Sequence, residues 1–579
     1  MSDIEKNQAH ITNSSEEGAT ATAPVSRGWW GDFVDGFKIV NYERMDTHGM
    51  SQAQIAAVLT ANQPLKRSLK ARHIQMIAIG GAIGTGLFIG SGGSLSAGGP
   101  ASTIIGFIVI GIMLFCMMQA LGEMAVRFPV SGSFASYSTR FLDPSWGFAM
   151  GWNYALQWLV VFPLELVAAS LVIGFWDSDD NGATNVNKAA WVSLFYATIV
   201  FINIFGVRGY GEAEFIFSLI KVLGVVGFCI FGIIAAAGGI PPNHHYYGAH
   251  FWYDPGAFHN GFKGFVSVFV NAAFAFSGTE LSGLAAAETS NPAKALPRAV
   301  KQVFWRVLLF YVVALTIVSM LVPYDDPRLG LHKDGRSSPF VLAIVDTGVK
   351  ALPSILNAII IIAVLSVANS AVYGCSRTLC ALGTYGQAPH WLAYVDRQGR
   401  PIFATLVTVI FGLLCFVSAS PKEGQVFDWL LAFSGLSSLF TWGSVCLAHI
   451  RYRAGMKKQG RSLDELAFSA QAGVYGSYVG FGINIAIICL EFWVAVWPMG
   501  AKPSATNFFQ VYLSMPVVLA FYLAHKIWYR TPLFVRSHEM DLDSGMRNLN
   551  KEQVIAEVRE EKEYIASRNF FYRTYRFWC

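Results

Sequence analysis

The chain is built from one long apolar run after another. Twelve runs long enough to cross a bilayer as helices, each of about 18 residues or more, follow one another between residues 74 and 529. They lie near 74–97, 100–126, 147–176, 189–207, 212–239, 263–289, 302–323, 355–384, 402–420, 426–450, 474–498 and 505–529. Because the runs are continuous rather than alternating, they exclude a β-barrel. We therefore expect an all-α polytopic membrane protein with twelve transmembrane helices.

The composition agrees with this expectation. Of the 579 residues, 54% are hydrophobic and only 14% are charged, whereas an average soluble domain carries about 25% charged residues. A chain of this composition has too few polar residues to cover several soluble domains. The net charge of +5 is small and does not indicate a nucleic-acid partner.

The distribution of the charges predicts the orientation. The basic stretch LKRSLKARH stands directly before the first apolar run, and no signal peptide precedes it. With the N-terminus in the cytoplasm, Lys and Arg residues in the expected inner loops outnumber those in the outer loops, as the positive-inside rule requires. We expect a cytoplasmic tail over 1–73, a twelve-helix domain over 74–529 and a cytoplasmic tail over 530–579.

No metal or cofactor site is expected. Seven of the eight cysteines lie in apolar runs, where a cysteine ordinarily acts as a small core hydrophobe. There is no Cys-x-x-Cys pair, and the adjacent His244 and His245 lie in an expected outer loop. The eighth cysteine, Cys579, ends an aromatic and basic tail beside the membrane, which is a position open to palmitoylation.

The first run predicts a broken helix. Seven glycines lie between Gly80 and Gly93, and each destabilises a helix interior by roughly 1 kcal/mol relative to alanine. Close packing through small-xxx-small spacing is one explanation, and an unwound segment at Gly84, Thr85 and Gly86 is the other. We favour unwinding because the glycines cover several faces. A half-helix starting there points its positive N-terminus at an anion such as a carboxylate.

The sixth run carries a matching interruption, Ser277, Gly278, Thr279 and Glu280. An acidic residue at membrane depth is costly, so Glu280 is expected to face a cavity or a partner. A buried structural hydrogen bond is the alternative to a functional role. Paired broken helices at corresponding positions of two halves are typical of transporter sites built from inverted repeats.

Three further ionisable residues lie within apolar runs. Lys221 in the fifth run is expected either to snorkel toward an inner loop or to act in proton coupling or as the cation in a cation site. Glu123 ends the second run four residues before Arg127, so a structural ion pair is expected, with gating as the alternative. Glu165, two residues after Pro163, has a structural or a functional role. The eighth run places polar groups on one face, lining a pathway or binding neighbouring helices: Ser366, Asn369, Ser370 and Tyr373.

Several long motifs follow one another in order along the chain. They are LKARHIQMIAIGGAIGTGLFIGSGGSLSAGGP, ALGEMAVRFPVSGSFASYSTRFLDPSWGFAMGWNY, FAFSGTELSGLAAAETSNPAKALPRAVKQVFWRV, SPFVLA, ANSAVYGCSRTL and the FWC ending. Together they resemble the fungal amino-acid permeases of the amino acid–polyamine–organocation superfamily. The resemblance extends from Lys66 to Cys579 and is greatest to broad-range general amino-acid permeases, with proline permeases near.

The resemblance implies a leucine-transporter-type 5+5 inverted repeat with two appended helices, and a proton as the coupled ion. It implies that backbone carbonyls of the sixth helix hold the substrate amino group under an aromatic lid, and that Lys221 acts in proton coupling. It also implies trafficking and ubiquitin machinery as partners of the tails, and palmitoylation at Cys579. The substrate-binding residues that it implies are Ile83, Gly84, Thr85, Gly86, Phe274, Ala275, Phe276, Ser277, Gly278, Thr279 and Glu280.

These observations together predict a proton-coupled symporter that takes up L-amino acids of broad range by alternating access across the plasma membrane, among membrane lipids. Either Lys221 or Glu280 is expected to carry the proton. The alternatives are an amino-acid sensor of the same fold and a narrow-range permease, for example for proline. An enzyme is not expected, because no motif pairs a nucleophile with a base.

Overall fold

The structure, a computed structural model, describes residues 65–130, 132–176, 186–241, 244–329, 338–419 and 423–546, with single positions and short pieces of both tails. In this part of the chain the regular structure is helical, apart from one isolated bridge between Leu69 and Thr289. Eight helices are long and apolar enough to cross a membrane, or nine if one bent pair counts as a span. The chain is therefore an all-helical, multi-pass membrane protein. Cys579 and most of the N-terminal tail lie outside the described residues.

The helices follow one another along the chain, with short 3₁₀ and π segments labelled η. The first part contains α4 (Ala71–Gly80), η1 (Gly86–Gly90), α5 (Ser91–Arg127), α6 (Ser133–Phe141), α7 (Pro144–Ile173), η2 (Gly174–Trp176), α8 (Lys188–Ile204), α9 (Gly206–Ala236), η3 (Trp252–Gly256), α10 (Gly261–Phe276), α11 (Leu281–Leu284), η4 (Ala285–Glu288), α12 (Pro292–Arg306), η5 (Val307–Val313) and α13 (Ala314–Leu321). The second part contains α14 (Pro339–Val345), α15 (Leu352–Thr384), η7 (His390–Ala393), α16 (Ile402–Gly412), η8 (Leu413–Ala419), α17 (Glu423–Lys458), η9 (Leu463–Glu465), α18 (Gly473–Val496), α19 (Ala505–Tyr512) and α20 (Ser514–Tyr529).

Local sequence explains where two of these helices begin. Asp143 accepts a hydrogen bond at 3.0 Å from the backbone N–H two residues on, and Pro144 opens α7. Asn291 accepts one at 3.3 Å from the backbone N–H three residues on, and Pro292 opens α12. Such caps satisfy N–H groups that the first helical turn leaves unpaired, and proline has no N–H to lose there.

Several spans are bent or short. Within α5, Gly99 has a non-helical backbone (φ 80°, ψ 175°) and Pro100 follows it, so the first and second apolar runs meet at a kink. The pair α19 and α20 is bent by 71°. Two shorter apolar helices cover Lys188–Ile204 and Ile402–Val417. The long spans, the bent pair and the short helices overlap the apolar runs expected from the sequence, but their bounds differ. One continuous helix, Gly86–Arg127, joins the first two runs, and another, Pro292–Leu321, begins ten residues before the run expected there.

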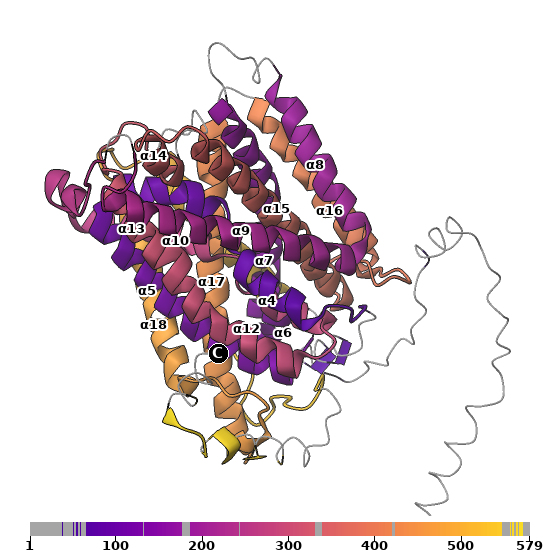
Figure 1. Cartoon of the computed structure of the whole chain (residues 1–579). Coiled ribbons are helices and arrows are strands. Elements are labelled where there is room, and N and C mark those ends of the chain that lie inside the picture. Colours follow the sequence, from indigo (N-terminus) through magenta and orange to yellow (C-terminus); the bar gives the residue numbers. More distant parts are fainter. Residues whose placement is uncertain are drawn as a thin grey trace, which may run out of the picture.

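The spans pack side by side in one bundle, as Figure 1 shows. Helix α7 contacts α15, α17, α20 and α6, while α10 packs on α5 and α17. Helix α15 also contacts α9 and α16, and α18 packs on α5 and α17. Helix α4 packs on α9 and α12, so the helices that carry the interrupted runs, α4, α5 and α10, all pack against other spans.

The faces turned away from this core stay apolar. Large side chains on α8, α9, α16 and α18 are more than half exposed, among them Leu194, Phe201, Leu223, Ile410 and Val479. Large apolar side chains exposed on several helices are unsuited to water and suited to lipid tails. Their positions agree with spans whose backbone polar groups are satisfied inside each helix.

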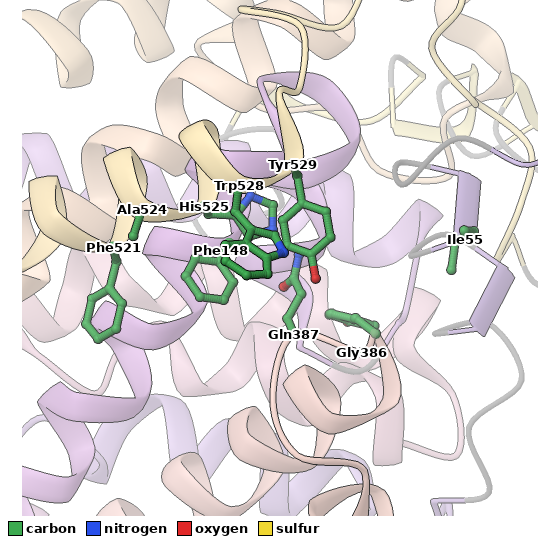
Figure 2. A pocket seen from close by; sticks show the side chains of 10 residues that line it. Ile55, Phe148, Gly386, Gln387, Phe521, Ala524, His525, Trp528 and Tyr529 are labelled. Atoms are coloured by element: carbon green, nitrogen blue, oxygen red, sulfur yellow. The ribbon is translucent and has the colours of Figure 1, made fainter.

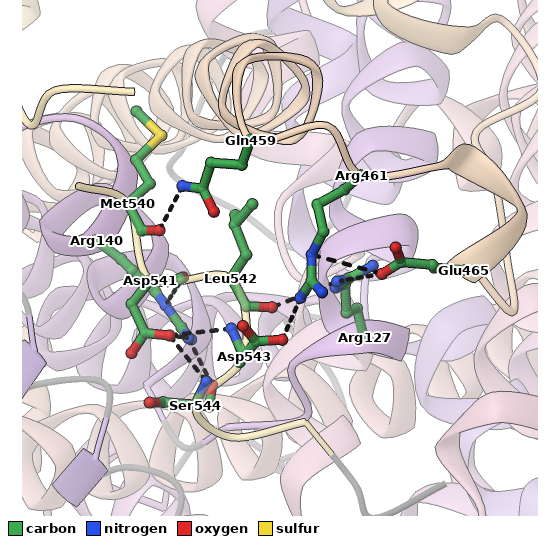
Figure 3. Close-up of polar contacts among 10 residues, drawn as sticks. All are labelled: Arg127, Arg140, Gln459, Arg461, Glu465, Met540, Asp541, Leu542, Asp543 and Ser544. Atoms are coloured by element: carbon green, nitrogen blue, oxygen red, sulfur yellow. Dashed lines mark hydrogen bonds and ion pairs between the residues drawn. The ribbon is translucent and has the colours of Figure 1, made fainter. Parts of the chain in front are cut away.

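The chain after α20 turns back across the ends of α5, α6 and α17 (Figure 3). The Arg140 guanidinium donates from Nε to the carbonyl oxygen of Asp541 at 2.9 Å and from Nη2 to that of Ser544 at 2.6 Å. The amide of Gln459 donates to the carbonyl oxygen of Met540 at 2.8 Å, and the Leu542 side chain is buried. The described start of the C-terminal tail is therefore part of the packed structure.

Candidate functional site

The first spanning run is interrupted after α4. Four non-helical residues, 81–84, follow α4 before helical structure resumes at Thr85. The unwound segment expected at Gly84, Thr85 and Gly86 thus lies mostly earlier, and only Gly84 belongs to it. The physical reason is close packing, because a Cβ on Gly86 would lie 2.4 Å from the Cα of Ala275. Gly86 lets the helical segment after the break approach α10.

The sixth run is interrupted between α10 and α11. Ser277 has an extended backbone (φ −57°, ψ 144°), and Gly278 has a φ of +96°, which favours glycine. A Cβ on Gly278 would lie 2.5 Å from the carbonyl oxygen of Gly81. The two interruptions therefore touch through their backbones, with only glycine on each side.

Tyr311 of η5 lies against both interruptions. Its hydroxyl is 3.1 Å from the carbonyl oxygen of Ala82 and 2.8 Å from that of Ala275. Interrupting a helix frees carbonyl groups, which need partners where water is scarce. Tyr311 supplies a donor at the place where the first and sixth runs meet.

Glu280 is buried and held by donors from three elements. Its carboxylate accepts from the backbone N–H of Gly278 at 3.2 Å, from Trp442 Nε1 of α17 at 3.3 Å and from the Tyr154 hydroxyl of α7 at 3.5 Å. A buried carboxylate is tolerated when its oxygens are hydrogen-bonded. Both interpretations of Glu280, structural and functional, are compatible with this geometry.

Residue Thr279, next to Glu280, accepts a hydrogen bond from the Arg306 guanidinium, which is itself buried. Among the described residues, no hydrogen-bond partner faces Nε or Nη1 of Arg306. A cationic group therefore lies beside the sixth-run interruption.

Thr85 joins the first interrupted run to α7. Its hydroxyl donates to Glu165 Oε2 at 2.5 Å, and both side chains are almost completely buried. Glu165 thus lies next to the segment expected to receive the substrate carboxylate. Among the residues that the sequence singled out, Thr85 and Glu165 are brought into direct contact.

Lys221 does not snorkel. Its side chain has no exposed surface, and Nζ lies 3.8 Å from Oε1 of Glu214, which is equally buried. The Ser366 hydroxyl donates to Glu214 at 2.8 Å, and the Ser218 hydroxyl lies 3.2 Å from Oε1. Burial rules out the snorkelling alternative and leaves a buried ion pair on α9 that packs against α15.

The other polar residues on the same face of α15 bind neighbouring helices. Asn369 Oδ1 accepts from Asn203 Nδ2 of α8 at 2.8 Å. The Tyr373 hydroxyl donates to Glu288 of η4 at 2.5 Å. This face, foreseen as pathway or packing surface, is occupied by packing contacts in the structure.

Glu123 has different partners from the one expected. Arg127, four residues on, pairs with Glu465 at 3.3 Å, so the expected local ion pair is wrong. Glu123 instead accepts from Arg453 Nη2 at 2.6 Å and lies 3.1 Å from His449 Nε2. The reason is helix packing, because α17 brings two basic side chains to the end of α5. A structural role for Glu123 agrees with these contacts.

A cavity of about 620 Å³ lies elsewhere, between the start of α7, the end of α20 and the turn after α15 (Figure 2). Its walls include Phe148, Gln387, His525, Trp528 and Tyr529. The residues of the two interruptions do not line it, so the cavity is separate from the place where the interrupted spans meet. Within the described residues, no cluster of His, Cys, Asp and Glu is suited to a metal ion.

Comparison with known proteins shows the family of this chain. The family described as Amino acid permease matches residues 73–535. The chain belongs to the amino acid permease family. It is 54% identical over 562 residues to the General amino-acid permease GAP2 of Candida albicans, covering 96% of this chain and 94% of that one. It is 51% identical over 581 residues to the General amino-acid permease GAP1 of Saccharomyces cerevisiae, covering 99% and 95%.

A solved structure is also similar to this family member at low identity. The nucleobase-cation-symport-1 family transporter MHP1, in a closed conformation with bromovinylhydantoin bound, aligns with a TM-score of 0.48 and 15% identity. The alignment covers 84% of this chain and 99% of that one.

Sequence reasoning missed Glu214, Tyr311 and Arg306 of this family member. A signal for Glu214 was present, because it precedes Lys221 by seven residues, a spacing that places both on one helix face two turns apart. Tyr311 and Arg306 gave no such signal, since their partners lie in other helices.

Proposed function

We propose that this family member is a proton-coupled symporter that takes up L-amino acids of broad range across the plasma membrane. The observation that carries the proposal is the contact between two interrupted spans, Gly81 against Gly278, deep among buried helices. The relatives named general amino-acid permeases support the substrate class. A continuous helix offers no free backbone groups to a ligand, whereas two interruptions do.

The same proposal includes the topology. Twelve spans with both tails in the cytoplasm, arranged as a 5+5 inverted repeat plus two helices, account for the kink at Gly99 and for the two short apolar helices. In this arrangement α4, η1 and the start of α5 form the first span, and α10 and α11 the sixth. Corresponding positions in the two halves then carry the interruptions.

The amino acid is proposed to bind as a zwitterion between the interruptions. The segment Ile83–Gly86 would receive the carboxylate, because backbone N–H groups at the start of a helical segment favour an anion. The segment Phe274–Glu280 would receive the ammonium through backbone carbonyls, with an aromatic side chain as lid. Alternating access then requires helices on either side of this pair to rock.

Lys221 and Glu280 are proposed as the residues that couple the proton. Both are ionisable groups buried in the membrane core, where such residues mark ion and proton pathways. Lys221 lies beside Glu214, and Glu280 lies beside the interruption of the sixth run.

The test is labelled uptake of a panel of amino acids in cells that lack their own permeases, with and without a protonophore. We expect accumulation of several amino acids, abolished when the proton gradient collapses. Accumulation that survives the protonophore would reject symport. Uptake of proline alone would favour the narrow-range alternative over the broad range.

A matched pair of variants tests the site. Glu280→Gln keeps the size of the side chain and removes its charge, and we expect it to lose uptake while its abundance at the surface is normal. Glu539→Gln changes an exposed carboxylate near the end of the described tail and serves as the control. Normal uptake by the Glu280 variant would remove Glu280 from the coupling role.

A further inference from the structure

The buried carboxylate of Glu214 has no assigned role so far. It lies on α9 two turns before Lys221, and the two charged atoms are 3.8 Å apart with neither side chain exposed. We propose that Glu214 is the positioning residue that keeps the Lys221 ammonium charged and fixed, and thereby sets the proton dependence of uptake. The inference rests on the proposed proton-coupled symport.

The first step is the energetic need for a counter-ion. An ammonium taken out of water into the membrane core is strongly destabilised, and burial favours its neutral form. An anion within about 4–6 Å offsets this and favours the charged form. At 3.8 Å from Lys221 Nζ, Glu214 is placed to do so.

The second step is the state of Glu214 itself. Three serine hydroxyls surround its two oxygens: Ser366 at 2.8 Å, Ser218 at 3.2 Å and Ser370 at 3.4 Å. Hydroxyl donors stabilise a carboxylate more than a neutral carboxyl group. Ser366 and Ser370 therefore favour the ionised Glu214 that the Lys221 ammonium needs. The Ser218 hydroxyl has one proton, which it shares between Glu214 and the carbonyl oxygen of Met76 at 3.1 Å.

The third step concerns the other charged and titratable groups that face the pair. From α7, Glu165 interacts electrostatically with Lys221. From α9 itself, Tyr210 interacts with Glu214 and its hydroxyl lies 3.1 Å from Ser370 Oγ. From α15 and η4, Arg377 and Glu288 pair with each other at 3.4 Å, with Tyr373 bonded to that glutamate. The pair formed by Arg377 and Glu288 is neutral overall. Glu214 and Glu165 are therefore the anions left to balance Lys221.

The fourth step is the place of the pair in the fold. The Ser218 hydroxyl lies 3.1 Å from the carbonyl oxygen of Met76 in α4, and Ser366 belongs to α15. Helix α4 leads directly into the interruption of the first run. The pair thus joins the half-helix before the proposed substrate site to α9 and α15, so its charge state and the position of α4 are linked.

The experiment measures initial uptake as a function of external pH for Glu214→Gln, normalised to the amount of full-length protein at the cell surface. Without the Glu214 carboxylate, the Lys221 ammonium loses its proton more readily. A higher external proton concentration is then required to keep Lys221 charged. We expect the pH of half-maximal uptake to move to the acid side by about 1 to 3 units. Glu212→Gln is the matched control, because Glu212 lies on the same helix but is 44% exposed and paired with Arg72.

A Glu214→Gln variant with normal abundance and an unchanged pH midpoint would overturn the inference. Should that variant not reach the surface, the double variant Glu214→Gln with Lys221→Met removes both charges. We expect the double variant to restore abundance, because the fault of the single one is then an unpaired buried ammonium. An equal loss of surface abundance in the single and the double variant would also refute the pairing of Glu214 with Lys221.

The same measurements separate this inference from the proposed function. If wild-type uptake is indifferent to pH and to a protonophore, symport is wrong whatever Glu214 does. If wild-type uptake depends on the proton gradient and the Glu214 variant keeps the wild-type pH profile, only the role of Glu214 is wrong.

Discussion

The two interrupted spans approach so closely that adding one methyl group tests their contact. A Cβ on Gly278 would stand 2.5 Å from the carbonyl oxygen of Gly81, while ordinary contacts begin at 3.4 Å. The difference, 3.4 − 2.5, is 0.9 Å, and the obstacle is backbone rather than a flexible side chain. Gly278→Ala must therefore push the interruptions apart by roughly 1 Å.

Two energetic terms oppose the Gly278→Ala variant. Forcing a residue with a Cβ into the left-handed region costs about 1–2 kcal/mol, and overpacking a buried contact costs about 1–3 kcal/mol. The sum, about 2–5 kcal/mol, lies within the stability of many proteins. We therefore expect a folded protein whose site is misplaced, and a misplacement near 1 Å lowers activity on the order of 100-fold.

The assay is initial uptake per molecule at the surface, together with thermal unfolding of the detergent-solubilised protein. Gly227→Ala is the control, because its Cβ would meet nothing within 4 Å and α9 is regular there. That control is expected to keep wild-type uptake and to be slightly stabilised, since alanine favours a helix over glycine by about 1 kcal/mol. Wild-type uptake by Gly278→Ala would refute the idea that this close contact forms the site.

Buried polar contacts give three further predictions. Thr85→Val removes the hydroxyl that donates to Glu165, so the buried carboxylate loses its side-chain donor at a cost of about 1–3 kcal/mol. Uptake is expected to fall at least tenfold, with recovery in Thr85→Ser, and equal uptake in both variants would contradict the role of this hydrogen bond. Glu123→Gln leaves the buried side chains of His449 and Arg453 without their anion and is expected to destabilise the protein by about 3–5 kcal/mol. The melting temperature should fall accordingly, and an unchanged melting temperature would disprove this structural role of Glu123. Burial alone raises the pKa of Asp541, but the Arg140 guanidinium and nearby backbone amides outweigh it, so this pKa lies below its ordinary value. A group with a lowered pKa stabilises the docked tail above the unfolded pKa of about 3.9, and this contribution is lost as the pH falls through the folded pKa. Hydrogen exchange of 538–546, corrected for intrinsic rates, is expected to rise between pH 5 and about pH 3 more in wild type than in Asp541→Asn. Equal rises would argue against the ion pair of Arg140 Nη2 with Asp541 Oδ1, which lie 3.3 Å apart.

Much of the architecture could be read from the chain because a bilayer leaves few choices. Long apolar runs without water to bond their backbones must be helices, so the all-helical, multi-pass fold follows from residues 74–529 alone. The glycines around Gly84 and the polar insertion at Gly278 likewise mark the two interrupted runs, since neither pattern suits an unbroken helix.

The partners of buried charges could not be read in the same way. Glu123 has Arg127 at helical spacing, yet it pairs with Arg453, more than 300 positions away. Arg306 looks like a basic residue near a loop, yet its side chain is buried beside Thr279. Spacing along one helix gives the neighbours on that helix only.

The sequence by itself therefore determined that the protein is all-helical and multi-pass, and that the first and sixth apolar runs are interrupted. These properties depend on local composition and on the solvent around the chain. Only the tertiary structure decided that the break falls at residues 81–84, that Gly81 meets Gly278, and that Lys221 faces Glu214, whose carboxylate lies among three serines. These contacts form between helices distant in the chain or across turns of one helix. Such short contacts depend on how the helices pack against one another, and this packing cannot be read from the residues of one segment.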